Sequence, residues 1–417
     1  MNLVREDFPL ISNDTIDYLD SAATCQKPIA VVDSMSKFML EQNSTVRRGV
    51  YDLAVKATQE FDNARSSIQK FINAKSSCEV IFTRGATEGL NMIAYTLCQA
   101  LKGKAGVDAT NGRSSKLKTN GKIKIAISEM EHHANIVPWQ MQASLHDDIE
   151  IVIIPILDNG ELDLDALKKI LNDKELKVLA ITHTSNVLGT VNPIEEISKL
   201  AHANGVIVVL DACQAIAHKA LDVQKLDVDF MVFSAHKIYG PTGIGAVFAK
   251  EELLNELPPY HGGGDMIETV SFEKTTYTNL PNKFEAGTPA IVETIGFGAA
   301  IKYISKIGFD KIYEHEQKLL EMANQELNKF EKIKIIGQSR NKIGIVSFVF
   351  DDIEAFDIGT MLNQHKVAIR TGHHCAQPLM KRFGISACSR LSIGVYNNEN
   401  DIAKFISALE KTIKMFR

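Results

Sequence analysis

The sequence contains no apolar run long enough to cross a lipid bilayer. The longest runs, such as residues 149–157, are short and are interrupted by a charge, here Glu150. A transmembrane helix needs about 20 predominantly apolar residues. The first residues include Arg5, Glu6 and Asp7 and lack the apolar stretch of a signal peptide. We therefore expect neither a membrane span nor a secretion signal.

The chain also lacks a basic tract. Its formal net charge is −5, which argues against a large nucleic-acid-binding surface. Residues 102–122 are rich in Lys, Gly, Asn and Ser, but no aromatic residues lie between these charges. We interpret this stretch as an exposed, mobile insertion, because its composition cannot bury a core.

The cysteines show neither close pairing nor the CxxC spacing of metal or redox sites. The chain has six of them: Cys25, Cys78, Cys98, Cys213, Cys375 and Cys388. In a long chain without a secretion signal, this pattern predicts reduced thiols and a cytoplasmic location.

The length of 417 residues predicts two domains. Apolar strands alternate with amphipathic helices up to about residue 250, which is typical of an α/β fold with a mostly parallel sheet and right-handed crossovers. After a long helix that starts near residue 292, helices and strands follow a different order. We expect an N-terminal segment at 1–24 packed on the small domain, a large domain at 25–291, and a small α+β domain at 292–417.

Two predicted strands that follow one another in the sequence each lead to a side chain that could bind a cofactor. Residues 206–211 form an apolar run that ends in Asp211, and Lys237 follows the apolar run 230–233. Ligands of open α/β sheets bind at the carboxyl ends of the strands. A lysine beside an acid there fits pyridoxal 5'-phosphate (PLP), whose aldehyde bonds an amine and whose ring nitrogen pairs with an acid. The simpler alternatives are a surface lysine and a helix-capping aspartate.

A third strand leads into a turn of small residues and then into a helix. Residues 79–82 are followed by Gly85, Ala86 and Thr87. Backbone N–H groups and the helix dipole can hold a phosphate at such a turn. An ordinary capped helix start remains the alternative.

Histidines and a cysteine stand out at two further places. His132 and His133 follow the strand at 123–128, and because adjacent side chains point apart, at most one of them is expected to face a cofactor. Cys375 follows Arg370, His373 and His374 in a loop containing glycine, a setting that favours a reactive thiolate. The alternatives for Cys375 are an inert buried thiol or a zinc ligand.

Together with the lysine–aspartate pair, five segments resemble the group II (SufS-type) cysteine desulfurases of the class V aminotransferase family. They occur in family order: EHHANIVPW (131–139), TSNVLG (184–189), SAHK (234–237), FEAGTP (284–289) and RTGHHC (370–375). The resemblance covers the chain except residues 102–122. It implies the PLP-dependent transferase fold of type I, with a large domain around a mostly parallel sheet and a smaller α+β domain.

The resemblance also implies roles for individual residues. The implied PLP contacts are the Schiff base of Lys237, the ring-nitrogen partner Asp211, the phenolic-oxygen donor Gln214, the stacking and catalytic His133, and further contacts from Ala86, Thr87, Ser234, His236, Asn186 and, across a dimer interface, Thr288. Arg390 would clamp the substrate carboxylate, and Arg370 and Asn186 would also contact the substrate. No metal is implied.

The implied activity is the conversion of L-cysteine to L-alanine, with Lys237 as the base and a persulfide formed on Cys375. The sulfur would pass to an acceptor protein of the SufE or SufU type for iron–sulfur cluster assembly, and the enzyme would be a homodimer. A selenocysteine lyase acting on L-selenocysteine, another class V PLP enzyme and a non-catalytic scaffold remain alternatives. Cys25, Cys213 and Ala235 depart from the family's usual residues, each a small residue in place of another.

Overall fold

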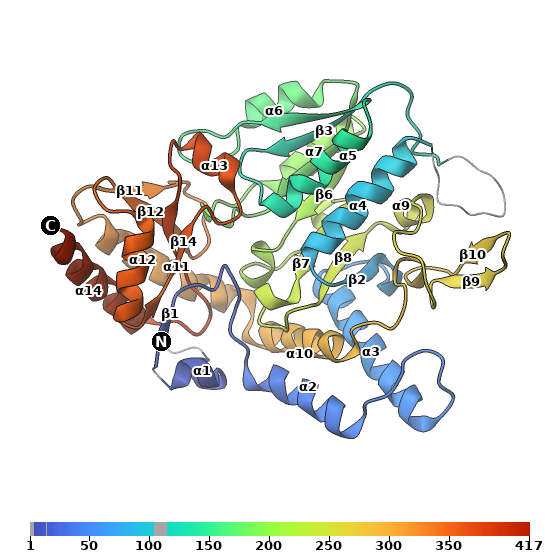
Figure 1. The fold of residues 1–417 in the computed structure, drawn as a ribbon, viewed down its shortest axis with the longest axis horizontal. Coiled ribbons are helices and arrows are strands. Elements are labelled where there is room, and N and C mark those ends of the chain that lie inside the picture. Colours follow the sequence, from blue (N-terminus) through green and yellow to red (C-terminus); the bar gives the residue numbers. More distant parts are fainter. Residues whose placement is uncertain (1–3, 14, 104–114) are drawn as a thin grey trace.

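The computed structural model describes residues 4–13, 15–103 and 115–417, and these form a larger and a smaller part joined by a long helix (Figure 1). The larger part contains a seven-stranded sheet with the strand order β2-β8-β7-β6-β5-β3-β4. The smaller part contains a four-stranded sheet with the order β11-β12-β15-β14. The predicted α/β fold class is confirmed.

The larger sheet is mostly parallel. Strands β4, β3, β5, β6 and β7 pair in parallel, whereas β8 runs antiparallel to both β7 and β2. The strands are β2 Val80–Thr83, β3 Ile123–Ser128, β4 Ile149–Ile154, β5 Leu176–Thr182, β6 Ile207–Asp211, β7 Phe230–Ser234 and β8 Gly245–Ala249. The middle strands are apolar throughout because helices cover both faces of the sheet.

Each face of this sheet has its own core. On one face, Ile125, Val178 and Val232 pack with α4 (Ala86–Leu101) and α5 (Val137–Leu145). On the other face, Leu179 and Val208 pack with α3 (Asp52–Phe71), α6 (Leu164–Leu171) and α7 (Ile194–Ala203). No helix in the described ranges is both long and apolar enough to traverse a membrane.

The helix that joins the two parts belongs by its packing to the larger one. Helix α10 (Ile291–Ile307) lies against α2 (Ile29–Glu41) and α3 (Figure 1). Helix α11 (Phe309–Leu327) instead packs on the small sheet and on α14 (Glu399–Phe416). We therefore propose Gly308 as the division between the domains, rather than the start of α10.

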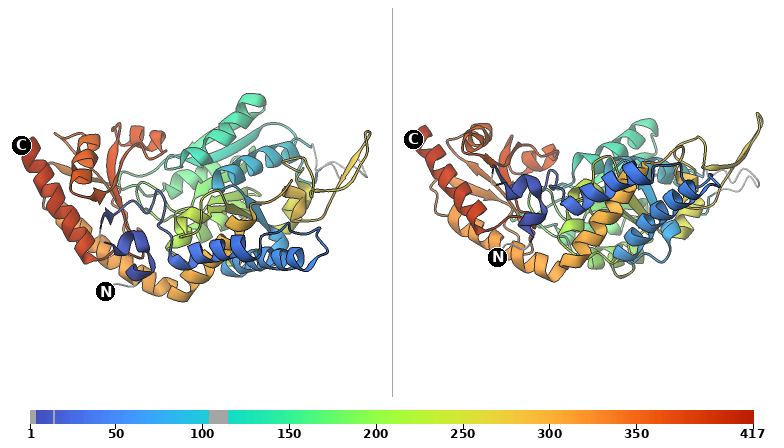
Figure 2. Two further views of the ribbon diagram at one scale, coloured as in Figure 1. Left: turned by 60° about the horizontal axis from the view of Figure 1, so that its bottom comes forward. Right: turned by 90° about the horizontal axis from the view of Figure 1, so that it is seen from below.

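The smaller part is an antiparallel sheet with helices packed against it. Its strands are β11 Ile333–Ile336, β12 Ile345–Phe350, β14 Arg370–Gly372 and β15 Cys388–Ser392, and α12 Ala355–Gln364 also packs on it. Helix α13 (Gln377–Arg382) instead contributes Leu379 and Met380 to the core shared with the larger part. The N-terminal segment adds a short parallel pair, β1 (Asp17–Tyr18) with β13 (Val367–Ala368). The N-terminus consequently lies beside the smaller part (Figure 2).

Strands β9 (Ile267–Val270) and β10 (Thr275–Tyr277) form a hairpin that projects from the body of the protein (Figure 2). One segment differs from the sequence-based prediction. Within the predicted insertion at 102–122, residues 104–114 lie outside the described residues. The part after them is not simply exposed, because Ser115 is buried and Lys116 donates its N–H to the Glu256 carboxylate.

A buried ion pair fixes the N-terminal segment to α14. Arg5 donates to the Asp401 carboxylate at 3.0 Å and to the Tyr396 carbonyl at 3.1 Å, and both charged side chains are buried. Arg5→Ala would leave Asp401 without its cation, so we expect the free energy of unfolding to fall by about 3–5 kcal/mol. Urea titration followed by circular dichroism measures this change. Lys329→Ala, which breaks an exposed ion pair with Glu326, is the control and should change it by less than about 0.5 kcal/mol; an equal effect of both substitutions would contradict the prediction.

Candidate active site

A cavity of about 230 Å³ opens at the carboxyl edge of the large sheet. It collects residues that follow β2, β3, β5, β6 and β7, because the carboxyl ends of these strands meet there. The lining residues are Ala23, Ala86, Thr87, His132, Ala134, Thr182, Thr184, Asn186, Asp211, Cys213, Gln214, Ser234, His236, Lys237 and Arg370. Most of the residues assigned from the sequence to PLP are therefore brought together.

Lys237 reaches the cavity from a single 3₁₀ turn, Ala235–Lys237, that directly follows β7. Its ammonium group donates to the carbonyl oxygens of Ala22 and, at 2.9 Å, of Ala23. Burial, together with the positive charge of Arg390, lowers the pKa of Lys237 to about 8. A lysine of this kind is a ready nucleophile near neutral pH.

Asp211 is buried at the end of β6, the strand next to β7. Its Oδ1 accepts a hydrogen bond from the Cys213 N–H at 2.9 Å. Gln214, one turn further, donates its side-chain amide to the Ala22 carbonyl, which also accepts from Lys237. The strand pairing of β6 and β7 thus brings the acid and the amine into one cavity.

The start of α4 forms a tight cradle at the same cavity. Gly85 has φ +150°, and a Cβ there would meet the Ser234 hydroxyl at 3.3 Å. A Cβ on Gly245 would come within 2.6 Å of the Gly85 Cα, so both glycines permit close backbone approach. Ser234 Oγ accepts from the Ala86 N–H at 2.8 Å, and Thr87 lines the cavity beside it. The positive end of the helix dipole lies here, which suits a phosphate.

These three features together fit PLP. The cavity offers an amine of lowered pKa for an aldehyde, a buried carboxylate for a ring nitrogen, and a glycine cradle at a helix start for a phosphate. Such a combination is expected of a PLP site and not of three unrelated structural features.

The histidine assigned to the cavity needs correction. His132 lines the cavity, whereas His133 does not. The His133 ring lies 5.5 Å from the His373 ring, and its Nε2 accepts from the Gln377 N–H at 3.1 Å. The prediction that His133 faces the cofactor does not fit this arrangement, because the His133 side chain contacts His373 and Gln377 outside the cavity lining. Ring stacking is proposed for His132.

Sequence reasoning missed Glu131, the residue before these histidines. Its buried carboxylate accepts from Ser128 Oγ, from Asn135 Nδ2 at 2.7 Å and from the Thr182 N–H at 2.9 Å. Burial raises the pKa of Glu131 to about 7, although these hydrogen bonds lower it. The network ties the ends of β3 and β5 together under the cavity. Glu131 lies three residues beyond the end of β3 and close to a second acid, Glu129, so no local pattern marked it as the buried one.

Cys375 lies next to the cavity and not among its lining residues. It follows β14 in a strained loop, where His374 and Cys375 have φ of +51° and +56°. Cys375 is partly exposed, and its carbonyl accepts from the His133 N–H at 2.7 Å. Asn186, which lines the cavity, donates to the His374 carbonyl at 2.8 Å and so connects the loop to the site. Strain of this kind is found at functional loops.

Arg390 lies behind the cavity and is almost fully buried on β15. Its guanidinium donates to the Asn186 carbonyl at 2.9 Å and to the Asp20 carboxylate at 3.0 Å. Arg370, its partner across the β14–β15 pair, does line the cavity. Asp20 could not be recognised from the sequence, since a single acid in a polar turn carries no distinguishing pattern.

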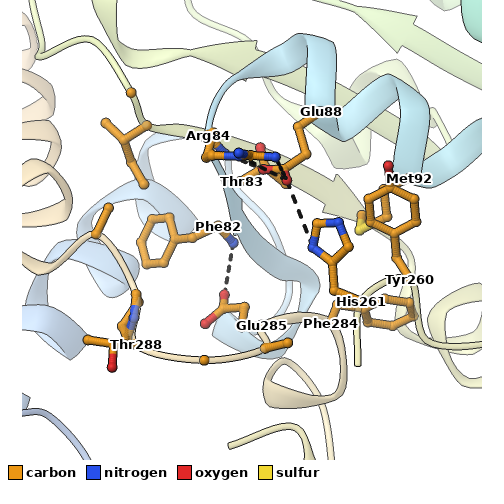
Figure 3. A pocket seen from close by; sticks show the side chains of 16 residues that line it. Phe82, Thr83, Arg84, Glu88, Met92, Tyr260, His261, Phe284, Glu285 and Thr288 are labelled. Atoms are coloured by element: carbon orange, nitrogen blue, oxygen red, sulfur yellow. Dashed lines mark hydrogen bonds and ion pairs between the residues drawn. The ribbon is translucent and has the colours of Figure 1, made fainter. Parts of the chain in front are cut away.

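Thr288 does not line the cavity that contains Lys237 and Asp211. It lines a second cavity of about 370 Å³, together with Thr83, Glu88, Tyr260 and His261 (Figure 3). Glu88 contacts Arg84 at 3.1 Å and His261 at 3.9 Å in this cavity. Within one chain, Thr288 therefore does not join the other phosphate candidates. No group of three or more His, Cys, Asp or Glu side chains suited to a metal occurs in the described part of the chain.

Comparison with known proteins adds a family and a group of relatives. The sequence profile named aminotransferase class-V matches residues 17–405. A cysteine desulfurase of Escherichia coli O8 (strain IAI1) is 43% identical over 413 residues, covering 98% of this chain and 97% of that protein. A cysteine desulfurase of Shigella flexneri is 42% identical over the same shares of both chains.

Solved structures give the same result. The apo structure of a cysteine desulfurase from Thermococcus onnurineus NA1 superposes with a TM-score of 0.90 at 34% identity, covering 99% of this chain and 98% of that one. The cysteine desulfurase CsdA of Escherichia coli, crystallised as an S-sulfonic acid, also gives 0.90, at 31% identity and with full coverage of both chains.

The lowered pKa of Lys237 can be measured on the cofactor-free protein. Competitive acetylation at a series of pH values, read by mass spectrometry, should give a midpoint for Lys237 near 8, because the neutral amine reacts and the ammonium does not. The ordinary pKa of a lysine side chain is about 10.4. A midpoint for Lys237 at or above that value would contradict the prediction.

Proposed function

The chain belongs to the aminotransferase class-V family, and we propose that it is a PLP-dependent cysteine desulfurase that converts L-cysteine to L-alanine and carries the sulfur on Cys375. The observation that supports this best is the meeting of Lys237 and Asp211 in one cavity, with the Cys375 loop joined to it through Asn186. The curated relatives named cysteine desulfurase extend over nearly the whole chain.

PLP would be held by residues from several strand ends. Lys237 would bond its aldehyde, Asp211 its ring nitrogen, and Gln214 its phenolic oxygen. Ala86, Thr87, Ser234 and His236 surround the region suited to the phosphate. When bound, PLP draws electrons away from the Cα of an attached amino acid and so weakens the bonds at that carbon.

Substrate binding would depend on the two arginines and Asn186. Arg370 and Asn186 line the cavity directly, and Arg390 lies just behind Asn186. A planar guanidinium matches a carboxylate with two parallel hydrogen bonds, which fixes the orientation of an amino acid. We propose Arg390 as the main carboxylate-binding residue.

Lys237 would also move the proton at Cα. Its lowered pKa of about 8 leaves a useful fraction of the amine neutral near physiological pH. The carbonyl oxygens of Ala22 and Ala23 hold the ammonium form in place, which positions the side chain for proton return.

Sulfur transfer then needs a second nucleophile, and we assign it to Cys375. Its thiolate would bond to the substrate sulfur while the C–S bond breaks, with the electron pair left on carbon. That carbon takes a proton and becomes the methyl group of alanine, and Cys375 retains a persulfide. L-cysteine and the Cys375 thiol thus become L-alanine and the Cys375 persulfide.

The finer assignment rests on the resemblance to group II cysteine desulfurases. We propose an acceptor protein of the SufE or SufU type for the persulfide sulfur, and a role in iron–sulfur cluster assembly. L-selenocysteine would use the same residues and can be compared in the same assay. The six free cysteines support a cytoplasmic location.

Replacing the nucleophile tests this function. Cys375→Ser should retain PLP and still bind L-cysteine with a change in its visible spectrum, yet its release of L-alanine should fall by at least about 100-fold, because no thiol is left to take the sulfur. After one turnover of the wild type, mass spectrometry should find the extra sulfur on the peptide containing Cys375. Cys78→Ser is the matched control. It removes another partly exposed thiol, distant from Cys375 in the sequence, and should remain active. Extra sulfur on Cys213 or Cys388 would overturn the assignment.

We also propose that the enzyme is a homodimer. Large apolar side chains are exposed along α2, α3 and the loop between them, including Met39, Leu40, Val50, Tyr51 and Val55. Exposed apolar surface of this extent is typical of an interface. The placement of Thr288 outside its own chain's PLP cavity supports the family pattern, in which this residue serves the neighbouring subunit.

A charge on this face should separate the subunits. Leu40→Asp combined with Val55→Asp should give a monomer in light scattering, since two carboxylates would have to be buried at the interface. Phe356→Asp, at an exposed apolar position on α12, is the control and should leave the dimer intact. A wild-type protein that is monomeric, PLP-replete and active would refute the proposal.

A further inference from the structure

Three side chains assigned above to chemistry bind the same short turn, residues 20–23. Lys237 donates to the carbonyls of Ala22 and Ala23, and Gln214 donates to the carbonyl of Ala22. Arg390 donates to the Asp20 carboxylate. The first two contacts use backbone oxygens, whereas the third is an ion pair between side chains.

The ion pair of Asp20 with Arg390 is deeply buried on the arginine side. Arg390 Nη2 and Asp20 Oδ1 are 3.0 Å apart, and the two side chains are 2% and 20% exposed. Arg390 Nη1 donates to the Asn186 carbonyl, while Nε has no hydrogen-bond partner in the described part of the chain. A buried guanidinium requires a counter-charge, and Asp20 supplies it.

Asp20 also lies among further positive charges. Arg370 faces Arg390 across the β14–β15 pair. Burial raises the pKa of Asp20, although Arg390, Arg370 and Lys237 each lower it. The Asp20 carboxylate thus occupies a place at the guanidinium that a carboxylate ligand would also take, and two carboxylates there would repel each other.

We propose that Asp20 is the resident counter-ion of Arg390 and that the carboxylate of the amino-acid substrate binds by replacing it. This inference rests on the proposed function, since it takes Arg390 as the carboxylate-binding residue. Arg390 keeps one carboxylate partner before and after the exchange, so its buried charge is never left unpaired. Asp20, the more exposed partner, turns toward solvent. A ligand without a carboxylate cannot replace Asp20, which makes the exchange a source of substrate selectivity.

Binding of L-alanine and of ethylamine to the PLP-loaded protein tests the exchange without turnover. The two ligands share an amine and differ by the carboxylate, and the visible absorbance of bound PLP reports their binding. Asp20→Asn should lower the dissociation constant of L-alanine about tenfold, since the competing charge is gone. The dissociation constant of ethylamine should not change. Damage to the fold would weaken binding and cannot produce this gain.

Two further variants make the result specific. Asp17→Asn alters another buried carboxylate of the N-terminal segment, paired with Lys404 at 3.0 Å, and should leave both dissociation constants unchanged. Arg390→Lys should lose the preference for L-alanine over ethylamine. If the wild type shows no such preference, or if Arg390→Lys keeps it, the carboxylate assignment in the proposed function fails together with the exchange.

The outcome that overturns the exchange alone is a folded, PLP-loaded Asp20→Asn protein with unchanged or weaker L-alanine binding, while Arg390→Lys behaves as expected. A crystal structure of the wild type with L-alanine gives a second test that needs no variant. Asp20 Oδ1 should then lie beyond hydrogen-bond reach of Arg390 Nη2. Retention of the 3.0 Å contact with the ligand bound would also overturn the proposal.

Discussion

The polar groups at the carboxyl edge of the large sheet depend on the contact of turn 20–23 with Lys237 and Arg390. A buried ammonium and a buried guanidinium each need partners, because the loss of hydration is otherwise uncompensated. The turn provides two carbonyl oxygens for Lys237 and one carboxylate for Arg390. It therefore satisfies charges that come from both parts of the molecule.

Hydrogen bonds from the smaller part hold residues 20–23 in place. Ala22 donates its N–H to Ser392 Oγ at 2.9 Å, and Ser21 Oγ lies 2.7 Å from Tyr396 Oη. The β1–β13 pair fixes the residues just before the turn. A shift of the smaller part would consequently disturb Arg390 and Lys237 together. This coupling explains why the N-terminal segment, although short, bears on the site's electrostatics.

The charges around the cavity tune one another. Arg390 lowers the pKa of Lys237, and Asp20 and Asp211 provide negative charge nearby. Burial lowers the pKa of His132, which keeps that ring neutral and suited to stacking on an aromatic cofactor. The site thus combines an amine of lowered pKa with two neighbouring guanidinium groups, those of Arg370 and Arg390.

The sequence by itself determined the strands and the order of the chemical groups. The apolar runs at 206–211 and 230–233 predicted β6 and β7, and since consecutive parallel strands are commonly neighbours, they also predicted that Asp211 and Lys237 would meet. The small residues at 85–87 predicted the cradle at α4. Local patterns sufficed here because each element's burial is encoded in its own residues.

Only the tertiary structure decided what depends on contacts between distant segments. It brought His132 rather than His133 to the cavity lining, placed Thr288 in a second cavity, packed α10 on α2 and α3 of the larger part, and paired Asp20 with Arg390. The hydrophobic periodicity of a sequence indicates which residues are buried, but it does not indicate which residues they pack against. Asp20 and Arg390 are 370 positions apart in the sequence. Their pairing is fixed by how the N-terminal segment packs on the smaller part, and no local sequence pattern carries that information.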